Sequence, residues 1–240
     1  MTTLPEPQEL LQKTVAEIAL AVPQSLEVFN RYRVDYCCGG KRSLPEACDH
    51  AGLDVQEVIH EIEIAQKNQR HLNGLRFETL DPALLIDFIV QHHHQYVREA
   101  IPQVVQLLNR VAEAHGSDKP EVIQIRSIFI DLATKLLHHL PEEEEILFPA
   151  IKEFLETSAE SRFAIRVSVQ APVLVMEHEH EEAGSLIQVL RLLTNNYTVH
   201  EGACPTFKLT YTMLEEFDKD LMQHIHLENN ILFPTVKPDI

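Results

Sequence analysis

The chain has 240 residues, of which 20 are Lys or Arg and 37 are Asp or Glu, so its formal net charge is −17. Hydrophobic residues make up 45% of it, which is enough for a packed core and excludes a wholly disordered chain. The acidic balance argues against nucleic acid as a partner, because phosphate binding needs a basic face. The sequence suggests no signal peptide, no membrane span and no disulfide framework. We therefore expect a cytoplasmic protein without a membrane partner.

Residues 1–72 are expected to form a small helical domain. Apolar residues at helical spacing predict a helix over Gln8–Ala21 and a second one over Ser25–Arg31. A loop containing Cys37–Gly40 follows, and Asp54 is placed to cap a further helix. Asn73–Gly74 interrupts the helical pattern and is expected to mark the domain boundary.

Residues 80–240 are expected to form an up-down-up-down four-helix bundle, which makes the chain all-α. Pro residues near the first turn and polar turns between the apolar repeats set the expected helix limits. The four helices are predicted to run from Asp81 to about Ala114, from Pro120 to about Leu155, from Pro172 to Thr194, and from Thr206 to about Phe233.

The bundle contains an internal repeat. The segment His139-x-x-x-Glu143-x-x-Ile-Leu-Phe-Pro recurs 85 residues later as His224-x-x-x-Glu228-x-x-Ile-Leu-Phe-Pro. A His-x-His pair that ends at His94 likewise recurs in the pair that ends at His180. The bundle is therefore interpreted as two copies of one helical hairpin, which places like residues opposite each other.

Helical periodicity selects one core-facing His on each predicted helix and one Glu on each of the second and fourth. The selected residues are His94, His139, Glu143, His180, His224 and Glu228. Val90 and Ile146 belong to the same apolar stripes and are expected in the core. The neighbouring histidines are expected on the polar faces; these are His92, His138, His178 and His226.

Four imidazoles and two carboxylates converging on one layer indicate a metal centre. A buried carboxylate is costly unless a positive charge offsets it, and a metal ion supplies that charge. Six ligands are too many for one tetrahedral site, but they suit two metals that are each held by two His and bridged by the Glu pair. Nitrogen and oxygen donors without a core thiolate favour iron, then manganese or zinc.

Each signal also has a simpler explanation. A single inward His is more often a hydrogen-bonded core residue, and a His-x-x-x-Glu pair is common on solvated helices. The matched spacing of the whole set favours the metal centre. Pro141 lies between His139 and Glu143 and removes a backbone hydrogen bond, so a bulge there would rotate Glu143 away from the His139 face.

Three segments of the chain resemble the repair-of-iron-centres family, whose members include YtfE and ScdA and carry a hemerythrin-like di-iron bundle. They are Val175-Met176-Glu177-x-Glu179-His180-x-Glu182-Ala183-Gly184, His224-x-x-Leu227-Glu228-Asn229-Asn230-x-Leu232-Phe233-Pro234, and Tyr32-x-x-Asp35-Tyr36-Cys37-Cys38-Gly39-Gly40-Lys41. The resemblance implies two non-heme iron ions, bridged by the two Glu, on the six residues that periodicity selects. It also implies repair of iron–sulfur clusters damaged by nitric oxide or peroxide, with damaged iron–sulfur proteins as partners.

Other functions stay open at this point. The centre could bind or reduce nitric oxide, or it could sense oxygen or nitric oxide, so enzymatic activity is undecided. Cys37 and Cys38 are candidates for redox exchange or iron transfer, or else ordinary thiols in a turn. Glu179 and Glu182 are either surface charges or carboxylates that ease iron release. The remaining residues of these types are expected to be structural or on the surface; they are Cys48, Cys204, His50, His60, His71, His115 and His200.

Overall fold

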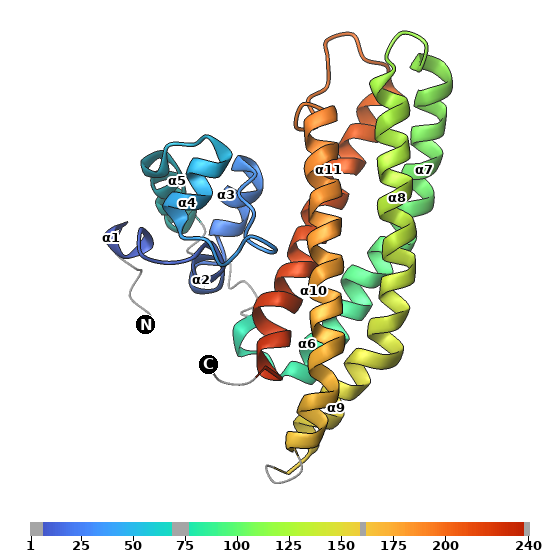
Figure 1. The fold of residues 1–240 in the computed structure, drawn as a ribbon. Helices are drawn as coiled ribbons and strands as arrows, with labels where there is room; N and C mark the ends of the chain where they lie inside the picture. The colour runs from blue at the N-terminus through green and yellow to red at the C-terminus, as the bar shows by residue number, and fades with distance from the viewer. Residues whose placement is uncertain (1–6, 69–76, 159–161, 238–240) are drawn as a thin grey trace. The chain divides into compact units, whose positions relative to one another are not determined.

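The computed structural model describes residues 7–68, 77–158 and 162–237, and these residues form helices and loops with no β-strand among them (Figure 1). The all-α expectation is therefore confirmed. No helix within the described ranges is both long enough and apolar enough to cross a membrane. By its contacts the chain divides into two units, Met1–Asp81 with Ile225–Pro234, and Pro82–His224 with Thr235–Ile240. Asn73–Gly74 and His71 lie outside the described residues.

Residues 7–68, the part of the N-terminal segment that the structure describes, contain five α-helices: α1 (Pro7–Leu10), α2 (Val15–Ala21), α3 (Ser25–Tyr32), α4 (Leu44–Ala51) and α5 (Val55–Asn68). The expectation of one helix over residues 8–21 is wrong, because Thr14 and Glu17 form a capping box that starts α2 after a break. Helix α4 was not predicted, although Ser43 and Glu46 form a second capping box at its start.

Four long helices run side by side in Figure 1: α7 (Gln95–His115), α8 (Glu121–Glu142), α10 (Arg162–Leu193) and α11 (Pro205–Leu227). Shorter helices continue the first two of these rods, α6 (Pro82–Phe88) before α7 and α9 (Phe148–Glu156) after α8. The up-down-up-down bundle is confirmed. Its interior is lined by the predicted apolar stripes, for example Val104, Leu132, Val173 and Leu214.

One predicted helix start is wrong. Pro172 was expected to open the third bundle helix, but it lies inside α10, which begins ten residues earlier at Arg162. Pro102 and Pro141 also lie inside α7 and α8. A proline removes one backbone hydrogen bond but its fixed φ suits a helix, so packing of the surrounding bundle can maintain the rod through it.

In the described part of the bundle, three short π-helical segments lie within or at the ends of the rods: Ile89–His94, Glu143–Leu147 and Glu228–Leu232. A π turn adds one residue to a helical turn and moves the following side chains around the axis. Two core expectations fail for this reason. Ile146 is 61% exposed while Leu147 is buried, and Ile89 is buried in place of Val90, which is only half-buried.

Candidate metal centre

The six selected residues are all buried, with side chains that are at most 4% exposed. They come from the four rods of the bundle. His94 ends the first π segment, Glu143 begins the second and Glu228 begins the third, so every π segment carries one of the six at its end. π turns are frequently found at functional sites, and here each one lies directly beside a residue of the cluster.

The four imidazoles form two facing pairs. Nε2 of His94 lies 3.1 Å from Nε2 of His224, and Nε2 of His180 lies 3.1 Å from Nε2 of His139. Each pair joins a His from the first predicted hairpin with a His from the second. The arrangement therefore offers two separate positions, and at each of them two imidazole nitrogen atoms could bind the same metal ion.

Glu143 lies between the two imidazole pairs. Its Oε2 atom is 3.2 Å from Nε2 of His139 and 3.4 Å from Nε2 of His94. The ligand atoms fall into two groups whose members lie within 4.8 Å of one another. One group is His94, Glu143, His224 and Glu228, and the other is His139, Glu143, His180 and Glu228. Because both carboxylates belong to both groups, they are placed to bridge two metal ions.

Pro141 does not separate Glu143 from His139. The α helix continues through Pro141, and the π turn begins only at Glu143. The i, i+4 relationship between His139 and Glu143 is therefore preserved, and the irregular turn moves only the residues that follow.

Two carboxylates outside the cluster fix the orientation of two of the imidazoles. Nδ1–H of His94 donates to Oε1 of Glu144 at 2.7 Å, and Nδ1–H of His139 donates to Oε2 of Glu179 at 2.6 Å. Arg98 also donates to Glu144, at 2.8 Å. Burial raises the pKa of Glu144, but the hydrogen bonds from His94 and Arg98 outweigh it and leave this pKa below its usual value.

These outer hydrogen bonds provide a test of whether the residues fit a metal. A proton held on Nδ1 leaves the lone pair on Nε2, and Nε2 is the atom of His94 and His139 that faces the cluster. The donor set is nitrogen and carboxylate oxygen, which suits iron, manganese or zinc. The residues therefore fit two divalent or trivalent metal ions, each with two imidazoles and shared carboxylates.

The structure also buries two histidines that the periodicity did not select. His93 is 4% exposed; its Nδ1 lies 2.9 Å from Oδ1 of Asp220, and its ring stacks on His224 with centroids 5.6 Å apart. His226 was expected on a polar face, but it is 2% exposed. It contacts the ring of Tyr36 edge-on, and burial lowers its pKa to about 4.

The contacts of His226 explain why the polar-face expectation is wrong. His226 and Tyr36 belong to the same contact unit, and the amide of Asn230 donates to the carbonyl oxygen of Tyr36 at 3.3 Å. The segment that covers His226 is nearly 200 residues away in the sequence. Helical periodicity within one rod carries no information about such a neighbour. The other three histidines expected on polar faces, His92, His138 and His178, are exposed.

The Cys37–Cys38 pair lies in a compact turn. Oδ1 of Asp35 accepts from the backbone N–H groups of Cys37 and Cys38, and Oδ2 accepts from that of Gly39. The two sulfur atoms are 3.4 Å apart and are not joined in a disulfide. Burial raises the pKa of the Cys37 thiol well above its usual value, with a further contribution from Cys38. Cys38 is partly exposed, whereas Cys37 is buried.

The remaining single-residue predictions concern two cysteines and several histidines. Cys48 is buried and its pKa is raised to about 11 by desolvation, which fits a structural thiol. Cys204 is half-buried and its sulfur lies 3.5 Å from Nε2 of His115. His50, His60 and His200 are exposed, whereas His115 is half-buried against Phe207.

Comparison with known proteins places these features in context. Residues 85–236 match the model of the hemerythrin HHE cation binding domain, and residues 11–66 match the ScdA_N model, which is described as a domain of unknown function.

The chain is similar to known proteins over nearly its whole length. It is 37% identical over 221 residues to the iron-sulfur cluster repair protein YtfE of Citrobacter koseri, covering 92% of this chain and 94% of that protein. It is 38% identical over 221 residues to YtfE of an Escherichia coli strain, with the same coverage. It is 36% identical over 229 residues to a probable iron-sulfur cluster repair protein of Haemophilus influenzae, covering 94% and 96%.

Proposed function

The chain belongs to the family of YtfE-type iron–sulfur cluster repair proteins and has a metal-binding hemerythrin HHE domain, and from this we propose that it restores damaged iron–sulfur clusters by donating iron. The observation that carries the proposal is the pair of imidazole sets that share two carboxylates. Two iron ions on His94, His139, Glu143, His180, His224 and Glu228 would form the store. We infer that the protein acts in the cytoplasm under nitrosative or oxidative stress.

The domain limits that we propose are 1–72 for the small helical domain and 80–240 for the di-iron bundle. The family models lie inside these limits, over 11–66 and 85–236. In this division the bundle stores the metal. The small domain is proposed to meet the recipient through its Cys37–Cys38 turn, because two sulfur atoms lie 3.4 Å apart there and Cys38 is partly exposed.

The chain's own residues have distinct tasks in this proposal. His94 and His139 hold their Nδ1 protons against Glu144 and Glu179 and so present bare Nε2 atoms to the metal. Glu143 and Glu228 supply two negative charges inside the bundle, and bound iron offsets their burial cost. Iron is the cargo in this proposal. When an ion leaves, negative charge of the buried carboxylates is again uncompensated, and this favours binding of a new ion.

The test is an anaerobic transfer assay. The iron-loaded chain is mixed with an enzyme whose [4Fe–4S] cluster nitric oxide has degraded, together with a thiol reductant and a sulfide source. We expect the recipient's activity to return while iron leaves the chain in matching amounts. The His94→Ala, His139→Ala double variant should be inactive, and free ferrous iron at the same concentration is the control. Recovery that is independent of the chain's iron would reject the proposal.

The Cys pair is tested in the same assay. Cys37→Ala with Cys38→Ala should slow the transfer and leave the iron content unchanged. Cys48→Ala is the matched control, because it removes a buried thiol elsewhere in the same domain. Transfer at the unmodified rate in the double variant would remove the thiols from the proposal and leave the iron store in place.

A second candidate function is binding or reduction of nitric oxide at the same centre. It is favoured by a cavity of about 200 Å³ whose wall includes His139 and His180, since this cavity gives a small molecule a path to two of the ligands. Electrons would have to come from another protein. Catalytic loss of nitric oxide in the presence of a reductant, without loss of iron from the chain, would favour this function over iron donation.

A further inference from the structure

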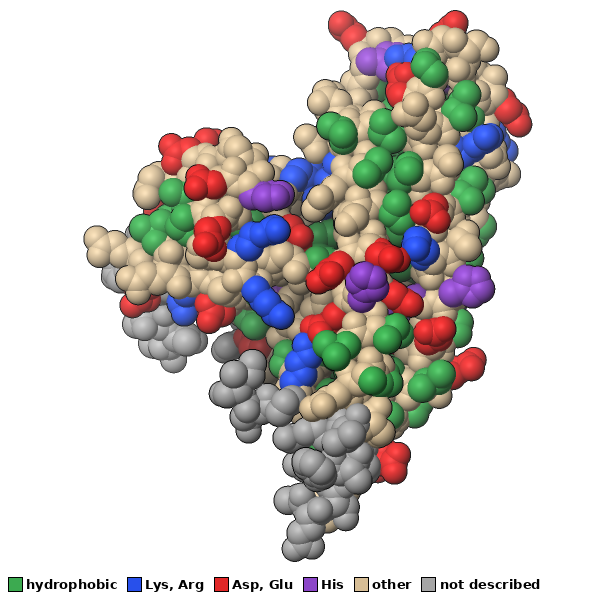
Figure 2. All heavy atoms as spheres, in the orientation of Figure 1, with side chains coloured by type: hydrophobic (Ala, Val, Ile, Leu, Met, Phe, Trp, Pro, Cys, Tyr) green, Lys and Arg blue, Asp and Glu red, His purple; other side chains and the backbone are tan. Residues whose placement is uncertain are grey.

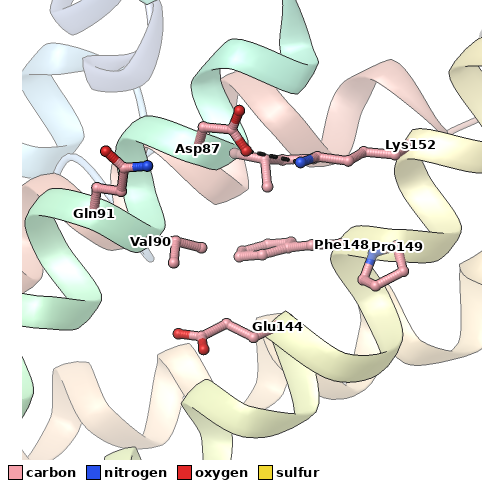
Figure 3. A pocket seen from close by; sticks show the side chains of 8 residues that line it. Asp87, Val90, Gln91, Glu144, Phe148, Pro149 and Lys152 are labelled. Atoms are coloured by element: carbon pink, nitrogen blue, oxygen red, sulfur yellow. Dashed lines mark hydrogen bonds and ion pairs between the residues drawn. The ribbon is translucent and has the colours of Figure 1, made fainter.

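The two ends of the ligand cluster differ in what lies outside them. A cavity of about 200 Å³ lies between α8 and α10, and both His139 and His180 form part of its wall. A larger cavity of about 310 Å³ lies near His94, between α6, α9 and the segment that joins α6 to α7. Its wall includes Glu144 and Phe148 but none of the six selected residues (Figure 3). Only the first of these two cavities reaches the ligands.

Aromatic rings pack against both imidazoles at the His94 end. The ring of Phe148 stacks on His94 with centroids 5.7 Å apart and planes 23° apart. The ring of His93 stacks on His224 at 5.6 Å with planes 5° apart. An imidazole that is covered by a ring on its outer face cannot swing away without displacing that ring. The imidazole pair at this end is therefore held in place by its neighbours.

Charged side chains surround the mouth of the cavity between α8 and α10. Lys135 and Glu182 form an ion pair across it at 2.9 Å, and the side chain of Glu179 is 38% exposed while it accepts from His139. Figure 2 shows histidine and acidic side chains gathered over α8 and α10 about half-way along the bundle. Carboxylate oxygens at such a mouth lower the energy of a cation that has given up part of its ligand shell.

We propose that iron enters and leaves through the cavity between α8 and α10, so that the ion held by His139 and His180 exchanges before the ion held by His94 and His224. This inference rests on the proposed iron store and specifies at which of its two positions iron exchanges first. A cation can pass from imidazole to carboxylate and water within this cavity. At the other end the rings of Phe148 and His93 lie against the imidazoles, so a cation could pass only after these rings had moved.

The test begins with the iron-loaded full chain, reduced and kept anaerobic, in the presence of a coloured ferrous chelator. We expect iron to leave in two phases of equal size, the first at least about tenfold faster than the second, which corresponds to a modest difference in barrier. Refilling the rapidly lost half with ⁵⁷Fe(II) should give a single Mössbauer environment. Loss of all iron in one phase, or ⁵⁷Fe divided equally between two environments, would overturn the inference.

Two matched variants locate the path. Thr134→Trp adds bulk at the exposed rim of the α8–α10 cavity and should slow the fast phase about tenfold or more. Val90→Trp adds the same bulk in the other cavity and should leave both phases unchanged. Equal iron content and equal helical circular dichroism at the start show that both variants are folded. Slowing by Val90→Trp and not by Thr134→Trp contradicts the proposed path.

A second pair of variants decides the matter if the tryptophan variants do not load iron. Lys135→Ala removes a cation from the mouth of the α8–α10 cavity and should speed the fast phase about two- to fivefold, because a positive charge no longer opposes the departing ion. Lys152→Ala breaks the similar exposed ion pair with Asp87 at the other cavity, drawn as a dashed line in Figure 3, and should have no effect. Equal effects of the two would reject the inference. Failure of the unmodified chain to bind iron would instead reject the proposed function.

Discussion

Nδ1 of His94 and Oε1 of Glu144 lie 2.7 Å apart, and this contact orients the imidazole from outside the ligand cluster. Glu144 follows Glu143 directly in the sequence, but its carboxylate is directed to the outer side of His94 and pairs with Arg98. Two adjacent glutamates therefore have different positions: Glu143 belongs to the proposed ligand cluster, and Glu144 orients a proposed ligand from outside it.

Glu144→Gln should lower the affinity for iron by about 10- to 100-fold while the fold is maintained. An amide keeps the size of the side chain but accepts more weakly from Nδ1–H, so the tautomer of His94 is less well fixed. Competition with a chelator of known affinity measures the change. Glu145→Gln is the matched control, because Glu145 is exposed and one residue further on. An equal loss of affinity in both variants would mean that general surface charge, and not the contact with His94, is responsible.

Glu143→Ala and Glu228→Ala should each reduce the iron content from about two ions per chain to one or none, because each carboxylate belongs to both ligand groups. The absorption that arises from bridged ferric ions should disappear together with the second ion. Metal analysis after gentle purification from iron-replete cells gives the stoichiometry. Glu142→Ala, which changes an exposed neighbour, should retain both ions. Full occupancy in both of the first two variants would refute the bridging role.

The sequence predicted much of the fold, and the histidines that it selected lie together in the structure, because a 3.6-residue period is a property of each rod by itself. The prediction was wrong where the structure of one rod depends on contacts with other parts of the chain. His226 is buried through Tyr36, a residue from the far end of the chain. Pro172 lies inside α10, because packing maintains a helix that local propensity would end. Neither effect leaves a pattern within a window of ten or twenty residues.

The π turns are the third reason why burial was predicted wrongly, and they lie at the candidate site itself. Counting by three and four places Ile146 in the core, whereas the added residue of the π turn places Leu147 there. The selected pair His139 and Glu143 is still close in space, because His139 precedes the π segment and Glu143 is its first residue. The repeat offers a signal in retrospect: the same Ile-Leu-Phe-Pro sequence follows Glu228, where Leu232 is again fully buried.

Leu147→Ala should lower the free energy of unfolding by about 2–5 kcal/mol, because it removes a buried side chain and leaves a cavity. Ile146→Ala should change it by no more than about 0.5 kcal/mol, because that side chain is 61% exposed. Urea unfolding of the metal-free chain, followed by circular dichroism, measures both. The opposite order of effects would mean that helix α8 continues into α9 without the π turn.

The buried ion pair between Arg191 and Asp218 gives a prediction that is independent of the metal. Arg191 donates to both carboxylate oxygens of Asp218, at 2.6 and 2.7 Å, and the hydroxyl of Tyr197 donates to one of them at 2.8 Å. Asp218→Ala would leave the buried guanidinium without its counter-charge and should cost about 3–5 kcal/mol of unfolding free energy.

The paired replacement separates the charge from the packing at this position. Arg191→Met with Asp218→Leu removes both charges and keeps most of the volume, and it should recover most of the loss, because two desolvated charges cost about as much as their attraction returns. Tyr197→Phe removes only one hydrogen bond and should cost about 1 kcal/mol. Iron content should be unaffected in all three variants. A double variant as unstable as Asp218→Ala would show that the pair contributes net stability, and that its geometry outweighs the cost of burying it.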